Sequence, residues 1–311
     1  MFTGFLAVAG VEVFFALSGF LIGGILLDMA PTAANLRTFV VRRWYRTLPV
    51  YYVTLAVCLV FPRLLLEAPP SGSWRHFVFL QSLTQGAKFL NVSWSLAIEE
   101  WFYLLLPLLL LLRLRYLHAL LLLVAAGVLA RFLLPVDPRA ALVARPDAIA
   151  YGCLMAWLMR SAWRTHIEQQ AGTYALAGAA GMIAAFSAIV VLVDRGQYSR
   201  PAAASVYTAL PMFASLMMPF FAQLRLRPRA LVAIATFGAA VSYPIYLWHN
   251  QLIQFFSRTW LPPGAGMLHV IAVFLSATAI AYAFHLAIER PFMRRRPPMP
   301  PGWRSRLAPD R

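Results

Sequence analysis

Long apolar segments separated by short polar breaks follow one another along almost the whole chain. A helix that crosses a bilayer needs about 20 mostly apolar residues. Nine segments approach this length: 11–27, 45–66, 97–112, 116–134, 147–160, 172–193, 203–223, 231–256 and 266–288. The breaks contain proline and glycine and are too short to hold a second folded domain. The pattern therefore predicts one all-α, polytopic bundle of about nine transmembrane helices over residues 1–296.

Composition supports this prediction and excludes a soluble domain. Hydrophobic residues make up 61% of the chain and charged residues only 12%, whereas soluble domains have roughly 25% charged residues. The final segment, 297–311, is rich in proline and arginine and is predicted to be a disordered basic tail. The two cysteines lie in apolar segments and predict neither a disulfide nor a metal site.

The net charge of +16 raises the possibility of nucleic-acid binding, but the positions of the charges argue against it. If segment 11–27 runs from outside to inside and the helices then alternate, 18 of the 27 lysines and arginines fall on the cytoplasmic side. This asymmetry is typical of membrane proteins and places the C-terminus in the cytoplasm. We therefore expect membrane lipid as a partner and no nucleic acid.

A single carboxylate, Glu12, stands at the start of the first apolar segment. Charged groups inside a membrane are costly and usually mark a functional site, so Glu12 is a candidate site residue. The alternative is an interfacial residue that stays in contact with water.

Three arginines, Arg42, Arg43 and Arg46, lie around the start of the second apolar segment. On a helix, residues three and four positions apart lie on the same face, so these side chains can form one cluster. Arginine binds phosphate in a bidentate manner, which makes the cluster a candidate site for a phosphorylated ligand. The alternative is the ordinary positive charge of a cytoplasmic loop.

Two adjacent carboxylates, Glu99 and Glu100, begin the third apolar segment. Adjacent residues on a helix point about 100° apart, so one can face a cavity while the other accepts a hydrogen bond or meets a cation. Such a pair suits general acid–base chemistry. The alternative is a charged helix start that interacts with the helix dipole.

His249 follows an aromatic stretch in the eighth apolar segment. The alternating topology places it at the outer end of its helix, on the side of Glu12, Glu99 and Glu100. We expect these residues to meet at the outer face and the arginines to lie at the inner face. The alternative for His249 is an interfacial histidine packed among aromatic rings.

Four segments in order resemble elements of the acyltransferase-3 family. They are G-V-E-V-F-F-A-L-S-G-F-L-I at 10–22, F-V-V-R-R-W-Y-R-T-L-P at 39–49, W-S-L-A-I-E-E-W-F-Y at 94–103 and S-Y-P-I-Y-L-W-H at 242–249. The resemblance covers nearly the whole chain. It implies a protein of a bacterial-type inner membrane that transfers an acetyl or short acyl group from acyl-CoA to a carbohydrate hydroxyl, with acyl-CoA as co-substrate and no bound cofactor.

The resemblance also implies roles for individual residues. Glu99 and Glu100 would position or deprotonate the acceptor, Glu12 would orient the site, and His249 would be a secondary site residue. The arginine cluster would bind the donor phosphates. The substrate-binding residues would be Trp94, Ser95 and Tyr103.

The chain departs from the family pattern at its start. Family members carry a preceding helix with an essential arginine and histidine, but only nine residues precede Gly10, and the first histidine is His76. The expectation is therefore that the sequence begins inside a longer protein or represents an inactive remnant. A permease or flippase for lipid-linked glycans is the alternative from another class. The sequence does not select the acceptor, the acyl length or the oligomeric state.

Overall fold

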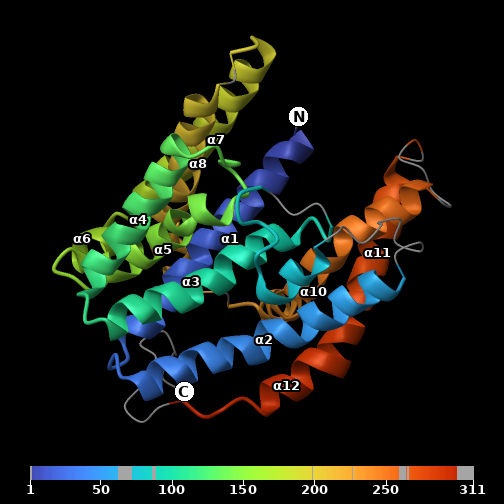
Figure 1. Cartoon of the computed structure of the whole chain (residues 1–311), viewed down its shortest axis with the longest axis horizontal. Coiled ribbons are helices and arrows are strands. Elements are labelled where there is room, and N and C mark those ends of the chain that lie inside the picture. The colour runs from blue at the N-terminus through green and yellow to red at the C-terminus, as the bar shows by residue number, and fades with distance from the viewer. Residues whose placement is uncertain are drawn as a thin grey trace.

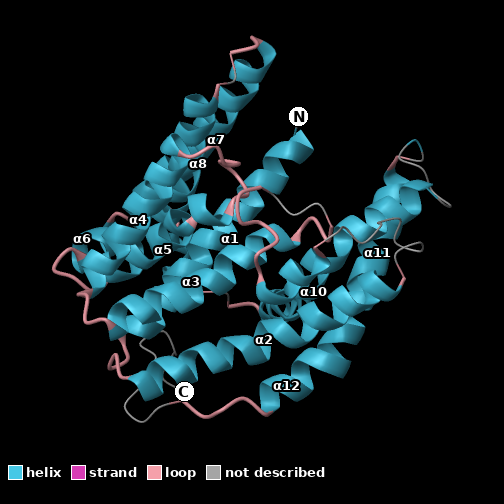
Figure 2. Ribbon diagram, viewed as in Figure 1, coloured by secondary structure: helices cyan, strands magenta, loops and turns pink. Residues whose placement is uncertain are grey.

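Helices make up the structure, and no strand occurs among the residues that it describes (Figures 1 and 2). The computed structural model describes residues 2–61, 72–85, 89–197, 199–225, 227–258, 264 and 266–299. The long helices are α1 (Phe2–Leu27), α2 (Ala33–Val60), α3 (Ser93–Leu111), α4 (Tyr116–Leu133), α5 (Pro146–Leu158), α7 (Ala171–Asp194), α8 (Arg200–Leu216), α10 (Arg229–Arg258) and α11 (Met267–Phe284). The shorter elements are η1 (Ser73–Val78), η2 (Leu142–Ala144), α6 (Arg164–Gln169), α9 (Met218–Gln223), η4 (His285–Glu289) and α12 (Arg290–Arg294).

The helices pack in two groups that α3 connects. On one side, α5 packs against α1, α4 and α8, and α7 packs against α8. On the other side, α10 packs against α11, and α2 contacts α10 and α12 (Figure 1). Helix α3 contacts α2 on one side and α4 and α5 on the other. The middle of the molecule is therefore the place where side chains from both groups can meet.

The predicted all-α membrane architecture is confirmed, whereas the count of nine spans is not. Within the described residues, seven helical stretches are long and apolar enough to cross a membrane. The predicted spans 45–66 and 147–160 correspond to α2 and α5, and neither is among the seven. Helix α5 has 13 residues and is therefore only about 20 Å long, which is shorter than the roughly 30 Å hydrocarbon core.

Helix α2 begins earlier than the sequence predicted. The Thr32 side chain caps it by accepting a hydrogen bond from the Asn35 backbone N–H at 3.3 Å, which starts the helix twelve residues before position 45. The three arginines therefore lie within the helix rather than in a loop before it. Residues 62–66 of the predicted span, and residues 300–311 of the predicted tail, lie outside the described residues.

Two glycines allow α1 and α5 to approach closely. A Cβ atom at Gly152 would collide with the Ala16 carbonyl oxygen, and one at Gly19 would collide with the Ile149 carbonyl oxygen. Small residues at such crossings let helix backbones come together in a membrane. The contact matters for function because α1 carries both Glu12 and Ser18.

We expect Gly152→Ala to destabilise the protein by about 1–3 kcal/mol, because the added methyl group forces the two helices apart. Thermal unfolding in detergent measures this effect. Gly238→Ala on α10 is the matched control. A Cβ there has no heavy atom within 4 Å, and alanine favours a helix more than glycine does, so the melting temperature should stay the same or rise slightly. Equal melting temperatures for the two variants would contradict the close approach.

Candidate active site

A buried carboxylate, Glu99, lies where α1 meets α3. Its Oε1 atom accepts a hydrogen bond from Ser18 Oγ at 2.5 Å and another from the Tyr103 hydroxyl at 2.6 Å. The two hydroxyl oxygens are themselves 2.9 Å apart. Tyr103 follows Glu99 by one helical turn, so α3 alone aligns the two side chains. All three residues are buried, and they form what we call the Glu99 cluster.

The adjacent carboxylate, Glu100, faces a different helix. Its Oε1 atom accepts a hydrogen bond from Thr47 Oγ1 on α2 at 2.7 Å. The Thr47 carbonyl oxygen in turn accepts a hydrogen bond from the Tyr243 hydroxyl on α10 at 3.0 Å. The 100° turn between adjacent helical residues thus directs Glu99 toward α1 and Glu100 toward α2 and α10.

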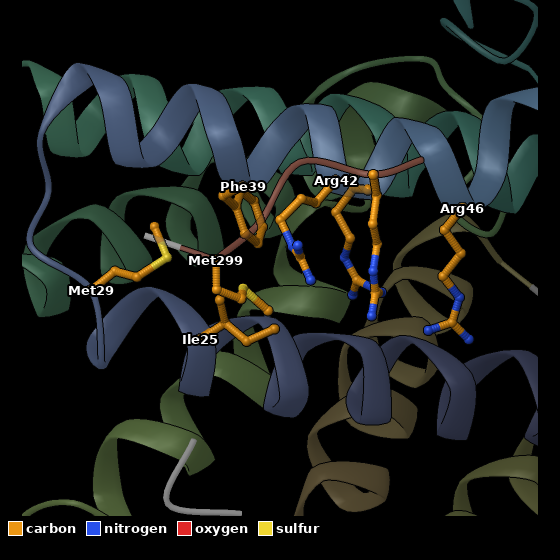
Figure 3. Close-up of a pocket in the computed structure, with 8 residues that line it drawn as sticks. Ile25, Met29, Phe39, Arg42, Arg46 and Met299 are labelled. Carbon is orange, nitrogen blue, oxygen red and sulfur yellow. The ribbon is translucent and has the colours of Figure 1, made fainter. Parts of the chain in front are cut away.

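Arg42, Arg43 and Arg46 of α2 line a pocket of about 160 Å³ between α1 and α2 (Figure 3). The pocket-lining residues, which we call the arginine pocket, are Ile25, Met29, Phe39, Arg42, Arg43, Arg46, Arg296 and Met299. Figure 3 shows the Arg42 and Arg46 side chains reaching from α2 toward α1.

Arg43 connects the arginine pocket to the Glu99 cluster. Its guanidinium carbon lies 5.1 Å from the centroid of the Tyr103 ring, a distance typical of a cation–π contact. The sequence placed the arginines and carboxylates at opposite faces, but the structure places them next to each other. The reason is that α2 starts early and lies along α3, with Arg43 beside Tyr103 and Thr47 beside Glu100.

Glu12 belongs to a separate buried network. Its Oε2 atom is 2.5 Å from Arg145 Nη2, and Arg131 Nη2 is 2.5 Å from Asp147 Oδ2. Both arginines also donate to the Tyr207 carbonyl oxygen, at 3.4 Å from Arg131 and 3.0 Å from Arg145. The four charged side chains are at most 1% exposed. This network ties α1 to α4, α5 and α8.

The structure does not bring His249 into contact with the Glu99 cluster or with the buried network of Glu12. Its Nδ1 atom is 2.7 Å from the Tyr246 carbonyl oxygen, and its ring packs against the Tyr246 ring. Among the described side chains, no hydrogen bond or ion pair joins His249 to Glu12, Glu99 or Glu100. The expected meeting of all four residues is therefore not observed, and His249 lies against its own helix.

The predicted substrate-binding residues fall in two places. Tyr103 is part of the Glu99 cluster, whereas Ser95 Oγ lies 2.6 Å from the Tyr246 hydroxyl. The Trp94 ring packs edge-on against Phe15 and also lies 5.6 Å from the guanidinium carbon of Arg139. No three His, Cys, Asp or Glu side chains within the described part of the chain lie close enough to hold a metal ion together.

Sequence reasoning missed several buried polar residues of these groups. Arg131 and Asp147 lie inside predicted apolar segments, so the same argument that identified Glu12 applies to them. Ser18 gave a weaker signal, because a single hydroxyl in an apolar helix commonly bonds to its own backbone. Its contact with Glu99 depends on how α1 and α3 pack.

Comparison with known proteins adds a family match. The acyltransferase-3 family model, described as an acyltransferase domain, matches residues 1–286. Peptidoglycan O-acetyltransferase OatA of Listeria monocytogenes is 34% identical over 126 residues, covering 34% of this chain and 20% of that protein. The chain therefore matches about a fifth of the length of this relative. No solved structure matches the chain.

Proposed function

Because the chain belongs to the acyltransferase-3 family, we propose that it is a membrane O-acyltransferase acting on carbohydrate. In this proposal an acetyl or short acyl group moves from acyl-CoA to a hydroxyl of a cell-surface polysaccharide or glycoside. The observation that carries the proposal is the contact between Arg43 and Tyr103, which joins a cationic pocket to a buried carboxylate. The similarity to a protein named as a peptidoglycan O-acetyltransferase supports the carbohydrate acceptor.

The arginine pocket is the proposed site for the phosphate groups of the donor. Guanidinium groups match phosphate oxygens in a bidentate geometry and keep their charge when partly buried. The pocket is smaller than the roughly 300–1,000 Å³ of typical small-molecule sites, so it fits phosphate groups rather than a whole CoA. In the proposed orientation, with the C-terminus in the cytoplasm of an inner-membrane protein, acyl-CoA approaches from the cytoplasmic side.

The Glu99 cluster is the proposed site of proton transfer. The acceptor hydroxyl oxygen attacks the thioester carbonyl carbon and gives its proton to Glu99, so that a C–O bond forms. The C–S bond then breaks, and the proton passes from Glu99 to the departing CoA thiolate, which returns the carboxylate to its starting form. Ser18 and Tyr103 hold the Glu99 carboxylate in place, while Glu100 faces α2, where Thr47 donates a hydrogen bond to it.

In this proposal Glu12 and His249 do not take part in proton transfer. Glu12 acts from its ion pair with Arg145, where it fixes the position of α1 and hence of Ser18. His249 remains a secondary site residue one turn beyond Tyr246, a residue that also contacts Ser95. Trp94 and Ser95 are proposed to border the acceptor.

The test is transfer of labelled acetyl groups from acetyl-CoA to carbohydrate in membranes that contain the native protein. We expect label in the carbohydrate fraction, and none in membranes without the protein. Solute flux that needs no acyl-CoA, in the absence of label transfer, would instead support the permease or flippase alternative.

We expect Arg43→Gln to raise the KM for acetyl-CoA by about tenfold or more, since it removes a charged hydrogen-bond donor from the pocket. Arg37→Gln is the matched control, because Arg37 is an exposed arginine of the same helix that does not line the pocket. If both variants showed the same KM, the pocket would not be the donor site.

A further inference from the structure

The arginine pocket receives a fourth arginine from the opposite end of the chain. Arg296, which follows α12, lines it together with Arg42, Arg43 and Arg46. The other four lining residues are apolar, so no carboxylate among the described residues lines the pocket. Arg296 therefore converts a cluster on one helix into a site with cations from two separate segments.

The segment that carries Arg296 is held over the pocket by several contacts. Arg42 Nη1 donates a hydrogen bond to the Pro297 carbonyl oxygen. Met299 lies between Ile25 and Phe39 within the pocket (Figure 3). Just before this segment, α12 packs against α2. The position of Arg296 thus follows from contacts on both sides of it.

The four pocket arginines, two of them half-buried and two exposed, differ in their partners from three other arginines of the protein. Arg131, Arg145 and Arg160 each form an ion pair with a carboxylate, at 2.5–3.0 Å. None of the four pocket arginines forms an ion pair within the described part of the chain. Glu99 acts on Arg43 and Arg46 only over a longer range.

Like charges held together are unfavourable unless an anion lies between them. Partial burial lowers the pKa of Arg42, and the nearby positive charge of Arg296 lowers this pKa further. CoA carries a diphosphate and a monophosphate, with a combined charge of about −4 near neutral pH. Its charge matches that of four arginines.

We propose that Arg296 is a donor-binding residue and that segment 296–299 closes the arginine pocket around the phosphate groups of CoA. This inference rests on the proposed function, because it takes acyl-CoA as the ligand. It adds a residue from the C-terminal segment to a site that the sequence assigned to α2 alone.

The test is CoA binding to the full chain in phosphatidylcholine nanodiscs, measured by calorimetry. Phosphatidylcholine adds no net anionic headgroup that would compete for the pocket. We expect Arg296→Gln to weaken CoA binding by about tenfold, the loss of one charged contact. Arg295→Gln changes the charge equally in the neighbouring exposed position, which does not line the pocket, and should bind CoA within about twofold of the unmodified chain.

The outcomes separate this inference from the proposed function. If the unmodified chain binds CoA and the two variants bind it equally well, Arg296 is not a donor-binding residue, and the proposed function stands. If the unmodified chain does not bind CoA, both the donor assignment and the role of Arg296 are overturned. Melting temperatures of the two variants, measured in the same nanodiscs, should agree and thereby exclude misfolding as the cause of weaker binding.

Discussion

Glu99→Gln is expected to lower the rate of acyl transfer by about 100- to 10,000-fold, the contribution typical of a positioned acid–base group. Glutamine has nearly the same shape as glutamate, and its carbonyl oxygen can still accept a hydrogen bond from Ser18 or Tyr103. It cannot accept the proton of the acceptor hydroxyl. The loss should therefore appear in kcat, with the KM for acetyl-CoA changed little.

The measurement is transfer of labelled acetyl groups per mass of folded protein in reconstituted vesicles. Glu168→Gln is the control, because Glu168 is a partly exposed carboxylate whose ion pair with Arg164 lies on α6. It should retain full activity. Unchanged transfer in both variants would remove Glu99 from the reaction and leave Glu100, on the other side of α3, as the carboxylate to test next.

Breaking the buried pair between Glu12 and Arg145 is expected to destabilise the protein by about 3–5 kcal/mol. Either Glu12→Leu or Arg145→Leu leaves one charge without its partner in a position that is at most 1% exposed. The loss should appear as a large drop in melting temperature in detergent and in the yield of folded protein.

The double variant Glu12→Leu with Arg145→Leu is expected to regain much of this stability. It removes both charges together, and replacing a buried ion pair by apolar side chains is often close to neutral. The Tyr207 carbonyl oxygen still accepts a hydrogen bond from Arg131 in that variant. A double variant as unstable as the two single variants combined would show that the two side chains act independently.

The membrane helices were predictable because length and apolar composition decide them. The predicted segments 97–112, 116–134 and 172–193 fall close to α3, α4 and α7. Segment 147–160 is helical, as predicted. Its apolar composition did not show that α5 is mostly buried among other helices. Hydropathy does not distinguish a short helix enclosed by protein from one that faces lipid.

The start of α2 shows a different limit. Arg42 and Arg43 interrupt the apolar pattern, so the predicted span began only at position 45. The helix itself depends on backbone hydrogen bonds, and its beginning is set by the Thr32 cap. The early start places all three arginines inside α2, which packs against α3. Arg43 therefore contacts Tyr103, although the sequence predicted that the arginines and the carboxylates lie apart.

The candidate residues could be predicted singly, but their partners could not. The cost of placing charge in a membrane identified Glu12 without any structure. Glu99 and Glu100 were identified as an adjacent pair of carboxylates suited to acid–base chemistry. Arg145 lies 133 positions from Glu12 in sequence, and Arg296 lies 250 or more from the arginines of α2. Only the packing of the helices determines which distant charges meet, so neither contact left a pattern in the sequence.

The central claim is that a donor bound through the arginine pocket places its acyl group at the Glu99 cluster. The most direct test is photo-crosslinking with an acyl-CoA that carries a diazirine on a short acyl chain, followed by mass-spectrometric mapping. The account predicts labelling near Ser18 and within 99–103 that excess CoA suppresses and Arg43→Gln weakens. Labelling elsewhere in the chain, undiminished by CoA or by Arg43→Gln, would contradict it.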